Sequence, residues 1–203
     1  MACVPAATTG AEAAAPPLLS QYPLQNPRKY HTIRPDQTER LNGPGGARMK
    51  RKRRRITMIA IASDHGGYLL KEHIKAYLAA KGVTCQDFGT DSTDSCDYPI
   101  FGKAAAQAVA SGQCEKGIVI CTTGIGISIS ANKVKGIRCA LCGDVLSAEM
   151  TRRHNDANML AMGAGIVGSL LAERIVDTFL NTAFEGGRHQ RRVDEMMAIE
   201  TEA

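Results

Sequence analysis

The sequence of 203 residues has no tryptophan, and its aromatic residues make up only 4% of the chain. Since 44% of the residues are apolar, the core must be built mainly from aliphatic side chains. No apolar run approaches the roughly 18 residues of a transmembrane helix, so no membrane partner is predicted. Cys139 and Cys142 are three positions apart, but no second pair or nearby histidine completes a zinc motif. We therefore predict no metal, no cofactor, and free thiols in the reducing cytoplasm.

The net charge of +5 is unevenly distributed along the chain. Residues 1–57 hold 11 of the 25 Lys and Arg and 3 of the 20 Asp and Glu, a net charge of +8, which leaves −3 for residues 58–203. The segment 1–57 is rich in Ala, Pro and Gly without apolar periodicity, so it is predicted to be a disordered basic leader or extension. Its basic block, residues 50–55, could bind nucleic acid, but we interpret it as a solvated tail and predict no nucleic-acid partner.

From Met58 onward, short apolar runs alternate with helical segments. Alternation at this spacing is typical of a parallel sheet covered on both faces. The sequence therefore predicts an α/β, doubly wound, Rossmann-like domain over residues 58–203, with a five-stranded parallel sheet and a C-terminal helix. Strands are predicted at 58–62, 83–88, 117–121, 137–142 and 158–162, and helices at 68–81, 100–111, 126–134, 145–153, 167–182 and 189–200.

Polar residues gather next to the predicted strands. In doubly wound sheets, ligands bind outside the carboxyl ends of the strands. Asp64 and His65 follow the first strand, Tyr98 lies after the second, and Cys121 ends the third. We expect His154, which precedes the fifth strand, to lie in the same cluster. The predicted site is therefore at the carboxyl edge of the sheet.

The stretch from Cys121 to Ser128, CTTGIGIS, joins a strand to a helix through small residues. Free N–H groups at such a junction favour a negative ligand, although a plain tight turn also needs its glycines. The loop lacks the third glycine of a dinucleotide fingerprint and the GK[ST] ending of a phosphate-binding loop, so a nucleotide is not favoured. Cys121 is either a reactive thiolate or a buried structural cysteine.

The remaining polar groups also have two interpretations each. His65 could face an anion, or its loop could start a helix with Asp64 as N-cap. His154 could transfer a proton, or lie at a capped helix end. Arg188 and Arg192, four positions apart, could grip a phosphate or form a solvated basic face.

Taken together, these motifs resemble the ribose-5-phosphate isomerase B family, which includes galactose-6-phosphate and allose-6-phosphate isomerases. The resemblance runs from Met58 to about Glu200. The motifs that carry it are SDHGG (63–67), DYP (97–99), CTTGIGISISANKV (121–134), GIR (136–138), RRHNDANMLAMG (152–163) and EGGRHQRRV (185–193).

This resemblance implies an enzyme, a metal-independent aldose–ketose isomerase of the pentose phosphate pathway. It would interconvert ribose 5-phosphate and ribulose 5-phosphate through an enediolate, with Cys121 as base. Thr123 would assist as a hydroxyl and His154 would open the sugar ring. Backbone N–H groups would hold the enediolate, Asn155, Asp64 and Tyr98 would contact the sugar, and a third group would hold the phosphate. The N–H groups belong to Gly124, Gly126, Ile127 and Ser128. The residues that would hold the phosphate are His65, Arg188 and Arg192.

Family members act as homodimers with shared active sites, so a homodimer, possibly a tetramer, is expected. Three positions depart from the family pattern: Ile127 stands where another branch has a glutamate base, Thr122 replaces a usual glycine, and Gly165 replaces a phosphate-binding arginine of many ribose-type members. The alternatives are therefore an isomerase of a six-carbon aldose phosphate, allose 6-phosphate or galactose 6-phosphate, and a non-catalytic sugar-phosphate-binding protein.

Overall fold

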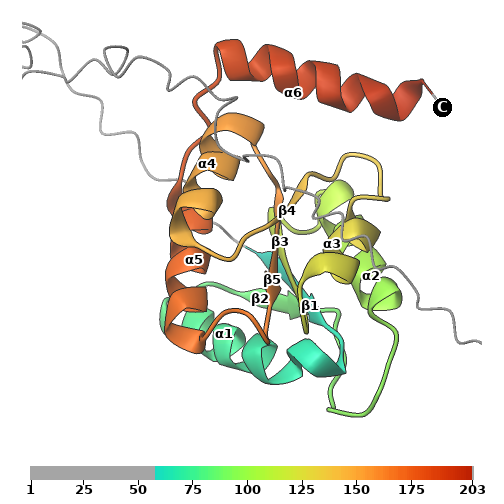
Figure 1. Cartoon of the computed structure of the whole chain (residues 1–203), viewed down its shortest axis with the longest axis vertical. Coiled ribbons are helices and arrows are strands. Elements are labelled where there is room, and N and C mark those ends of the chain that lie inside the picture. The colour runs from blue at the N-terminus through green and yellow to red at the C-terminus, as the bar shows by residue number, and fades with distance from the viewer. Residues whose placement is uncertain (1–57, 203) are drawn as a thin grey trace, which may run out of the picture. The chain divides into compact units, whose positions relative to one another are not determined.

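The structure is a computed structural model that describes residues 58–202, so the predictions made for residues 1–57 lie outside the described residues. Five parallel strands form one sheet in the order β2-β1-β3-β5-β4 (Figure 1). The strands are β1 (Ile59–Ser63), β2 (Cys85–Asp87), β3 (Lys116–Cys121), β4 (Cys139–Leu141) and β5 (Met159–Gly163). The helices are α1 (Tyr68–Ala80), α2 (Tyr98–Ala110), α3 (Ile125–Ala131), α4 (Val145–Asn155), α5 (Ser169–Asn181) and α6 (Arg188–Ala198), with short 3-10 turns at His65–Gly67 and Ile199–Thr201.

The predicted α/β fold is confirmed, and each predicted element is present with ends that differ by no more than three residues. Local sequence explains several of the element ends. Gly82 follows the end of α1 and has a φ of 71°. This left-handed conformation favours glycine and ends the helix there. Asp144 begins α4 by accepting a hydrogen bond from the Ser147 N–H at 2.7 Å.

Alternate side chains of the central strands point to opposite faces of the sheet. Ile59 and Ile61 of β1 pack with α1, α4 and α5, whereas Ala60 and Ala62 pack with α2 and α3. Both faces are therefore covered, which explains why β1 and β5 are buried along their whole lengths. Figure 1 shows α1 and α5 on one side of the sheet and α2 and α3 on the other.

The connections from β1 and β3 leave the sheet in opposite directions. β1 leads through α1 to β2 at one edge of the sheet, and β3 leads through α3 to β4 at the other edge. The ends of β1 and β3 lie side by side, with Ser63 paired with Ile120. This is a topological switch point, the place where open α/β sheets bind their ligands.

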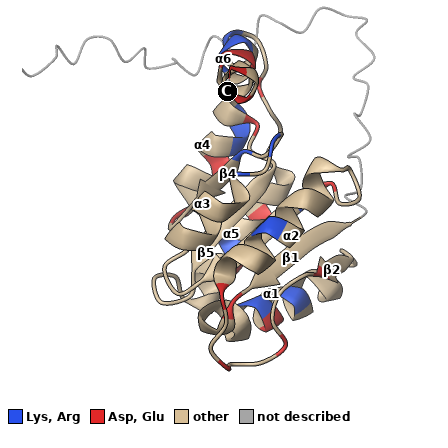
Figure 2. Cartoon of the chain, turned by 90° about the vertical axis from the view of Figure 1, so that its right-hand side faces the viewer, with Lys and Arg blue, Asp and Glu red and all other residues tan. Residues whose placement is uncertain are grey.

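Helix α6 lies apart from the two core clusters. It packs against α4, burying His189 and Val193, and neither residue belongs to either cluster. Figure 2 shows Lys and Arg together with Asp and Glu along α6. None of the helices within residues 58–202 is long and apolar enough to cross a membrane.

Candidate active site at the carboxyl edge of the sheet

Cys121 is the last residue of β3 and only 5% exposed. Its Sγ accepts a hydrogen bond from the Gly124 N–H at 3.0 Å. The loop can return to the sulfur because Gly124 has a φ of 78°, a left-handed conformation that favours glycine. The loop is also tied to the segment after β5, since the Cys121 carbonyl accepts from the Ala164 N–H at 2.9 Å. The thiol is therefore held in one place with a backbone donor on its sulfur.

The backbone donors of this loop are fewer than the sequence suggested. The Gly124 N–H is used by the sulfur, and the Ser128 N–H donates to the Gly124 carbonyl at 3.2 Å. The Ser128 hydroxyl is also engaged, donating to the Ile125 carbonyl at 2.7 Å. Within the described residues, the N–H groups of Gly126 and Ile127 have no acceptor. These two donors, in the first turn of α3, can still bind a ligand oxygen.

Thr123 lies beside these donors, with its side chain exposed to solvent. Its Oγ1 accepts a hydrogen bond from the Ile125 N–H at 3.3 Å. Because that bond uses the hydroxyl only as an acceptor, its proton can be donated to a bound ligand.

Asp64 and His65 follow β1 at the switch point. Asp64 is 5% exposed, and its Oδ1 accepts a hydrogen bond from the Gly67 N–H at 3.0 Å. It therefore caps the short 3-10 turn, as the N-cap interpretation of the sequence predicted. His65 Nδ1 accepts from the Cys96 N–H at 3.1 Å. Nδ1 also lies 3.3 Å from the Cys96 carbonyl, to which the other tautomer would donate. In the tautomer that accepts at Nδ1, the proton is on Nε2, which can then donate to an anion.

Tyr98 begins α2 and lies directly against α3. A Cβ at Gly126 would come within 2.5 Å of Tyr98 Cζ, so a larger residue at position 126 would displace the ring from its present position. Tyr98 is 39% exposed, which leaves it open to a ligand. The glycine loop therefore serves both its own turn and the placement of this tyrosine.

Thr122 and Gly165 are neighbours at the mouth of this site. The Gly165 N–H donates to the Thr122 carbonyl at 2.9 Å, and a Cβ at position 165 would lie 3.1 Å from that oxygen. Two of the three positions that depart from the family pattern therefore lie next to each other.

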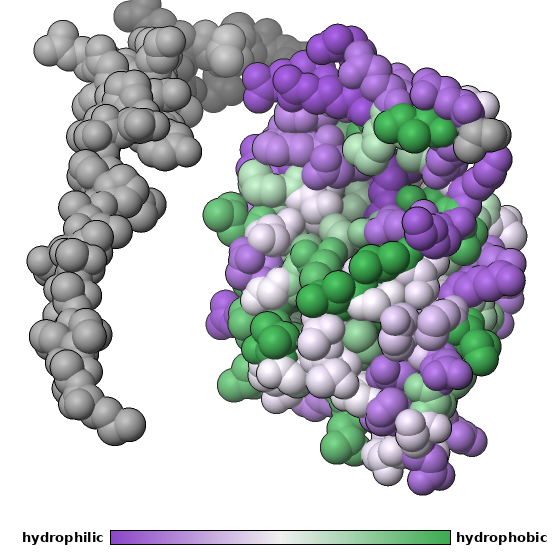
Figure 3. All heavy atoms as spheres, turned by 45° about the vertical axis from the view of Figure 1, so that its right-hand side comes forward, coloured by the Kyte–Doolittle hydropathy of each residue, from purple (hydrophilic) through white to green (hydrophobic). Residues whose placement is uncertain are grey.

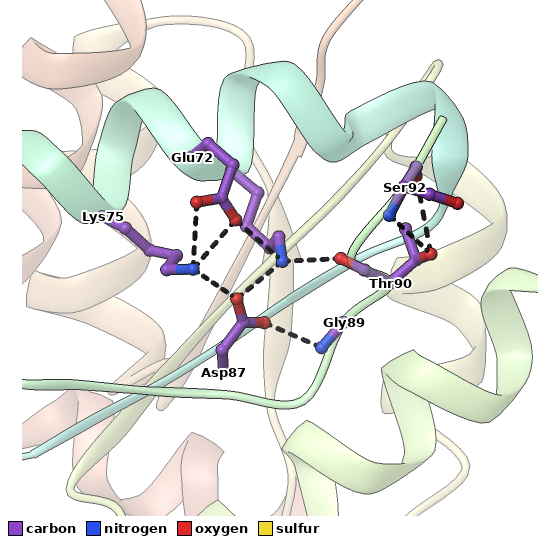
Figure 4. Close-up of polar contacts among 7 residues, drawn as sticks. Glu72, Lys75, Asp87, Gly89, Thr90 and Ser92 are labelled. Atoms are coloured by element: carbon purple, nitrogen blue, oxygen red, sulfur yellow. Dashed lines mark hydrogen bonds and ion pairs between the residues drawn. The ribbon is translucent and has the colours of Figure 1, made fainter. Parts of the chain in front are cut away.

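A buried lysine, Lys71, contacts the end of β2 and the start of the loop that follows it, and Figure 4 shows the polar contacts around Asp87 and Thr90. Lys71 is 1% exposed, and its Nζ lies 2.6 Å from Asp87 Oδ2, 3.1 Å from Glu72 Oε1 and 2.7 Å from the Thr90 carbonyl. The Thr90 N–H in turn donates to the Ser63 carbonyl at 3.0 Å. Burial raises the pKa of Asp87, but hydrogen bonds from Lys71 and Lys75 outweigh this effect and hold it below the ordinary value. Sequence reasoning missed this cluster.

His154 and Asn155 do not lie at the carboxyl edge, and the expectation that they would is wrong. They end α4 and precede β5, so they lie at the amino edge of the sheet. Cys121 is paired with Gly163, the last residue of β5. The four residue steps of β5 span about 13 Å, so His154 cannot contact Cys121 of the same chain.

Arg188 and Arg192 are also remote from Cys121, because α6 packs against α4. Figure 1 shows α6 at the end of the molecule away from the loop between β5 and α5. Both arginines are exposed, and within the described residues neither pairs with a carboxylate. They follow Gly186 and Gly187, whose φ values of 66° and 56° produce the sharp re-entry into α6. Their charges are therefore available to an anion.

His154 is stacked on His189, with ring centroids 4.2 Å apart and planes 4° from parallel. Glu185 Oε2 lies 3.7 Å from Nε2 of His154 and 3.6 Å from Nε2 of His189. Burial, together with the charges of His154 and Arg188, lowers the pKa of His189. Hydrogen bonding to Arg153 lowers the pKa of Glu185. Glu185 and His189 lie in the motif EGGRHQRRV, but no role was predicted for either, although their spacing of four was a visible signal.

The part of the chain that carries this site is similar to known proteins. The family model described as Ribose/Galactose Isomerase matches residues 59–196. Ribose-5-phosphate isomerase B of Escherichia coli is 49% identical over 142 residues, covering 70% of this chain and 95% of that protein. Galactose-6-phosphate isomerase subunit LacB of Clostridium acetobutylicum is 44% identical over 136 residues, covering 67% and 79%.

Solved structures are similar over the same region. Ribose-5-phosphate isomerase B of Clostridium thermocellum has a TM-score of 0.71 and 53% identity, covering 72% of this chain and 99% of that one. The Mycoplasma genitalium protein, solved with bound ribulose 5-phosphate, has a TM-score of 0.70 and 40% identity, covering 72% and 98%.

Proposed function

The chain belongs to the ribose/galactose isomerase family, and we propose that it interconverts ribose 5-phosphate and ribulose 5-phosphate. The observation that carries this proposal is Cys121, fixed at the switch point with a backbone donor on its sulfur and two unused N–H groups beside it. A thiolate base next to oxyanion donors is what proton transfer between two carbons requires. Similarity to proteins named ribose-5-phosphate isomerase B supports the pentose substrate.

In the proposed reaction, the Cys121 thiolate takes the proton from C2 of the open-chain aldose. The C2–H electron pair becomes the C1–C2 double bond, and the carbonyl pair moves onto the C1 oxygen. The N–H groups of Gly126 and Ile127 stabilise the resulting enediolate. Thr123 assists by moving a proton between the two oxygens. Return of the first proton to C1 then gives the ketose.

The phosphate and the sugar ring require the residues of both edges. His65 would donate to the phosphate from the carboxyl edge, and Arg188 and Arg192 would grip it bidentately from α6. His154 would open the ring by moving the proton of the anomeric hydroxyl to the ring oxygen as the bond between that oxygen and C1 breaks, with Asn155 beside it. Asp64 and Tyr98 would contact the sugar hydroxyls.

Because the two groups of residues lie at opposite ends of one sheet, we infer that the enzyme is a homodimer in which each site takes Cys121 from one copy and His154 from the other. Exposed apolar side chains support an interface on the α2–α3 side: Ile100 is 66% exposed, Ile125 53% and Ile129 54%. Figure 3 shows hydrophobic side chains gathered on this side of the molecule. Whether dimers pair into a tetramer is decided by measuring the mass in solution.

The first test compares Cys121→Ala with Cys114→Ala. Both cysteines are buried, but only Cys121 lies at the switch point. We expect Cys121→Ala to lose turnover of ribose 5-phosphate while remaining folded, and Cys114→Ala to keep it. Unchanged turnover in Cys121→Ala would refute the assignment. Allose 6-phosphate and galactose 6-phosphate belong in the same assay, because faster turnover of either would identify the alternative substrate, and binding without turnover would identify a non-catalytic protein.

The second test mixes two inactive variants, Cys121→Ala and His154→Ala, and allows their subunits to exchange. If sites are shared, each mixed dimer regains one intact site, and random mixing restores about a quarter of the wild-type sites. No restoration would mean that His154 of one copy does not share a site with Cys121 of the other.

A chain that starts at Met58 is expected to keep full activity, since every proposed site residue lies within 58–203. We also place the enzyme in the cytoplasm, because the six described cysteines are free thiols, as the reducing cytoplasm favours.

A further inference from the structure

Three potential metal ligands meet at the amino edge of the sheet, away from Cys121 of the same copy. His154 comes from the last turn of α4, Glu185 from the segment between α5 and α6, and His189 from the first turn of α6. Their donor atoms all lie within 4.8 Å of one another. His189 has a side chain only 8% exposed, and those of His154 and Glu185 are 36% and 38% exposed, so the group is partly enclosed.

The spacing is close to that of a metal-binding set. Two ligands of a tetrahedral zinc ion, each about 2.1 Å from the metal, are about 3.4 Å apart. Glu185 Oε2 already lies 3.6 Å and 3.7 Å from the two imidazole nitrogens. Since the rings are parallel, each must tilt out of the stack for its lone pair to point at a shared ion. The movement required is a rotation of the two side chains.

The surroundings also suit these ligands. Arg153 Nε donates to the other oxygen of Glu185 at 2.6 Å, which orients the carboxylate and leaves Oε2 facing the histidines. Arg188 Nε donates to His189 Nε2 at 3.4 Å, so the lone pair of that nitrogen is on the open side of the ring. Arg188 is exposed and can turn away when an ion replaces this weak contact.

We propose that His154, Glu185 and His189 form a binding site for a divalent transition-metal ion of the zinc class, and that the bound ion inhibits the enzyme by occupying His154. Two imidazoles and one carboxylate match zinc and its neighbours better than magnesium or calcium, which prefer oxygen ligands. Three protein ligands leave one position open to water. The ion takes no part in the isomerisation. The inhibitory part rests on the proposed role of His154.

Binding is tested on the full-length chain, freed of metal with EDTA and titrated with Co²⁺. Cobalt bound by histidine and carboxylate lacks the sulfur charge-transfer absorption that binding at a cysteine would produce, so the two kinds of site are distinguished. We expect one ion per chain without that band. His189→Ala and Glu185→Gln should weaken binding at least about 10-fold. Glu185→Gln keeps the shape of the side chain, and its circular dichroism should match the wild type.

His73→Ala is the matched control, because Nε2 of His73 lies 2.8 Å from Glu173 on the surface and no third ligand joins them among residues 58–202. It should bind the ion as the wild type does. Equal affinity in wild type, His189→Ala and Glu185→Gln would overturn the site, as would a spectrum dominated by sulfur.

The inhibitory part is tested with Zn²⁺ in the isomerase assay. Zinc should reduce turnover of the wild type and of His73→Ala, EDTA should restore it, and Glu185→Gln should need at least about 10-fold more zinc for the same inhibition. Binding without inhibition would overturn the inhibitory part. If no form of the chain turns over a sugar phosphate, the proposed function fails, whereas the cobalt titration still decides the metal site.

Discussion

The buried lysine beside the site allows a sharp prediction about stability. Lys71 is almost inaccessible, and Asp87, only 2.6 Å away, supplies most of its compensating charge. Removing one partner of a buried ion pair costs about 3–5 kcal/mol, because the other charge is left without compensation. Glu72 remains 3.1 Å from the lysine nitrogen and the Asp87 side chain is 25% exposed, which places the cost at the lower end. We expect Asp87→Ala to lose about 3 kcal/mol of unfolding free energy.

The assay is urea unfolding at pH 7, with the free energy extrapolated to zero denaturant. Every variant is measured at one protein concentration, since subunit association contributes to apparent stability. In a thermal scan, the same loss should lower the midpoint by roughly 10 °C. Asp177→Ala is the control, because its ion pair with Lys81 is exposed on both sides and should be worth less than about 1 kcal/mol. Asp177 also accepts a hydrogen bond from the Tyr77 hydroxyl at 2.7 Å, so the whole loss should stay below about 2 kcal/mol.

The lysine itself provides a second test of this explanation. If the cost in Asp87→Ala comes from a buried charge without a partner, then removing that charge should relieve it. The double variant Lys71→Met/Asp87→Ala should therefore be more stable than Asp87→Ala alone. A double variant that simply adds two losses, or an Asp87→Ala loss no larger than that of Asp177→Ala, would refute the explanation.

Three further predictions concern the loop, the thiols and the response to acid. Gly124→Ala should lower the free energy of unfolding by about 2–3 kcal/mol and remove most of the turnover, since its Cβ would lie 2.7 Å from the Met162 backbone carbon. Gly112 has the same φ of 78° but lies in open space, so Gly112→Ala should lose only about 1 kcal/mol in urea unfolding. Burial raises the pKa of Cys139 to about 12 and that of Cys142 to about 11, so iodoacetamide at pH 8 should leave both unmodified in peptide mass spectra of the native protein, and rapid labelling would contradict this. Because the folded-state pKa of Asp87 is lowered, its carboxylate stabilises the protein at pH values above the ordinary Asp pKa of 3.8, and this contribution is lost as the pH falls through the folded-state value. The difference in unfolding free energy between wild type and Asp87→Ala should therefore become smaller below about pH 4. A difference that stays constant with pH would contradict this.

The sheet could be predicted because its central strands are buried on both faces. β1, β3 and β5 appear in the sequence as short runs of Ile, Val, Ala and Met separated by helical segments, and only a sheet covered on both sides requires such runs. The loop around Cys121 could be predicted for a related reason: a reactive group at a strand end needs glycine and small residues beside it. In this loop the reactive thiol and the glycine turn that holds it are neighbours in the sequence, so both are visible in one short motif.

The position of His154 could not be inferred from its nearness to a strand, because the side of the strand decides the edge. A residue just after a parallel strand lies at the carboxyl edge, and a residue just before it lies at the amino edge. The contact of His154 with His189 depends on the packing of α6 against α4, between positions 35 apart. No local pattern encodes such docking.

Lys71 shows a different limit of sequence reasoning. It follows Leu70, which belongs to the apolar stripe of α1 with Ile74 and Leu78, and a lysine at such a position is normally taken as exposed. It is buried because Asp87 and the Thr90 carbonyl, from the next strand and loop, satisfy its ammonium group. The pairing becomes visible only when β2 is placed beside β1.

The two outermost strands, β2 and β4, are only three residues long. A long, flat outer strand would offer its unpaired backbone groups to any extended chain, including another copy of the same protein. Here each margin gives an incoming strand only a few hydrogen bonds, and Asp87 places a charge on one of them. Growth of the sheet from molecule to molecule, the route to fibrous aggregates, is therefore disfavoured at both sides, and stable association must come from side chains on the helices.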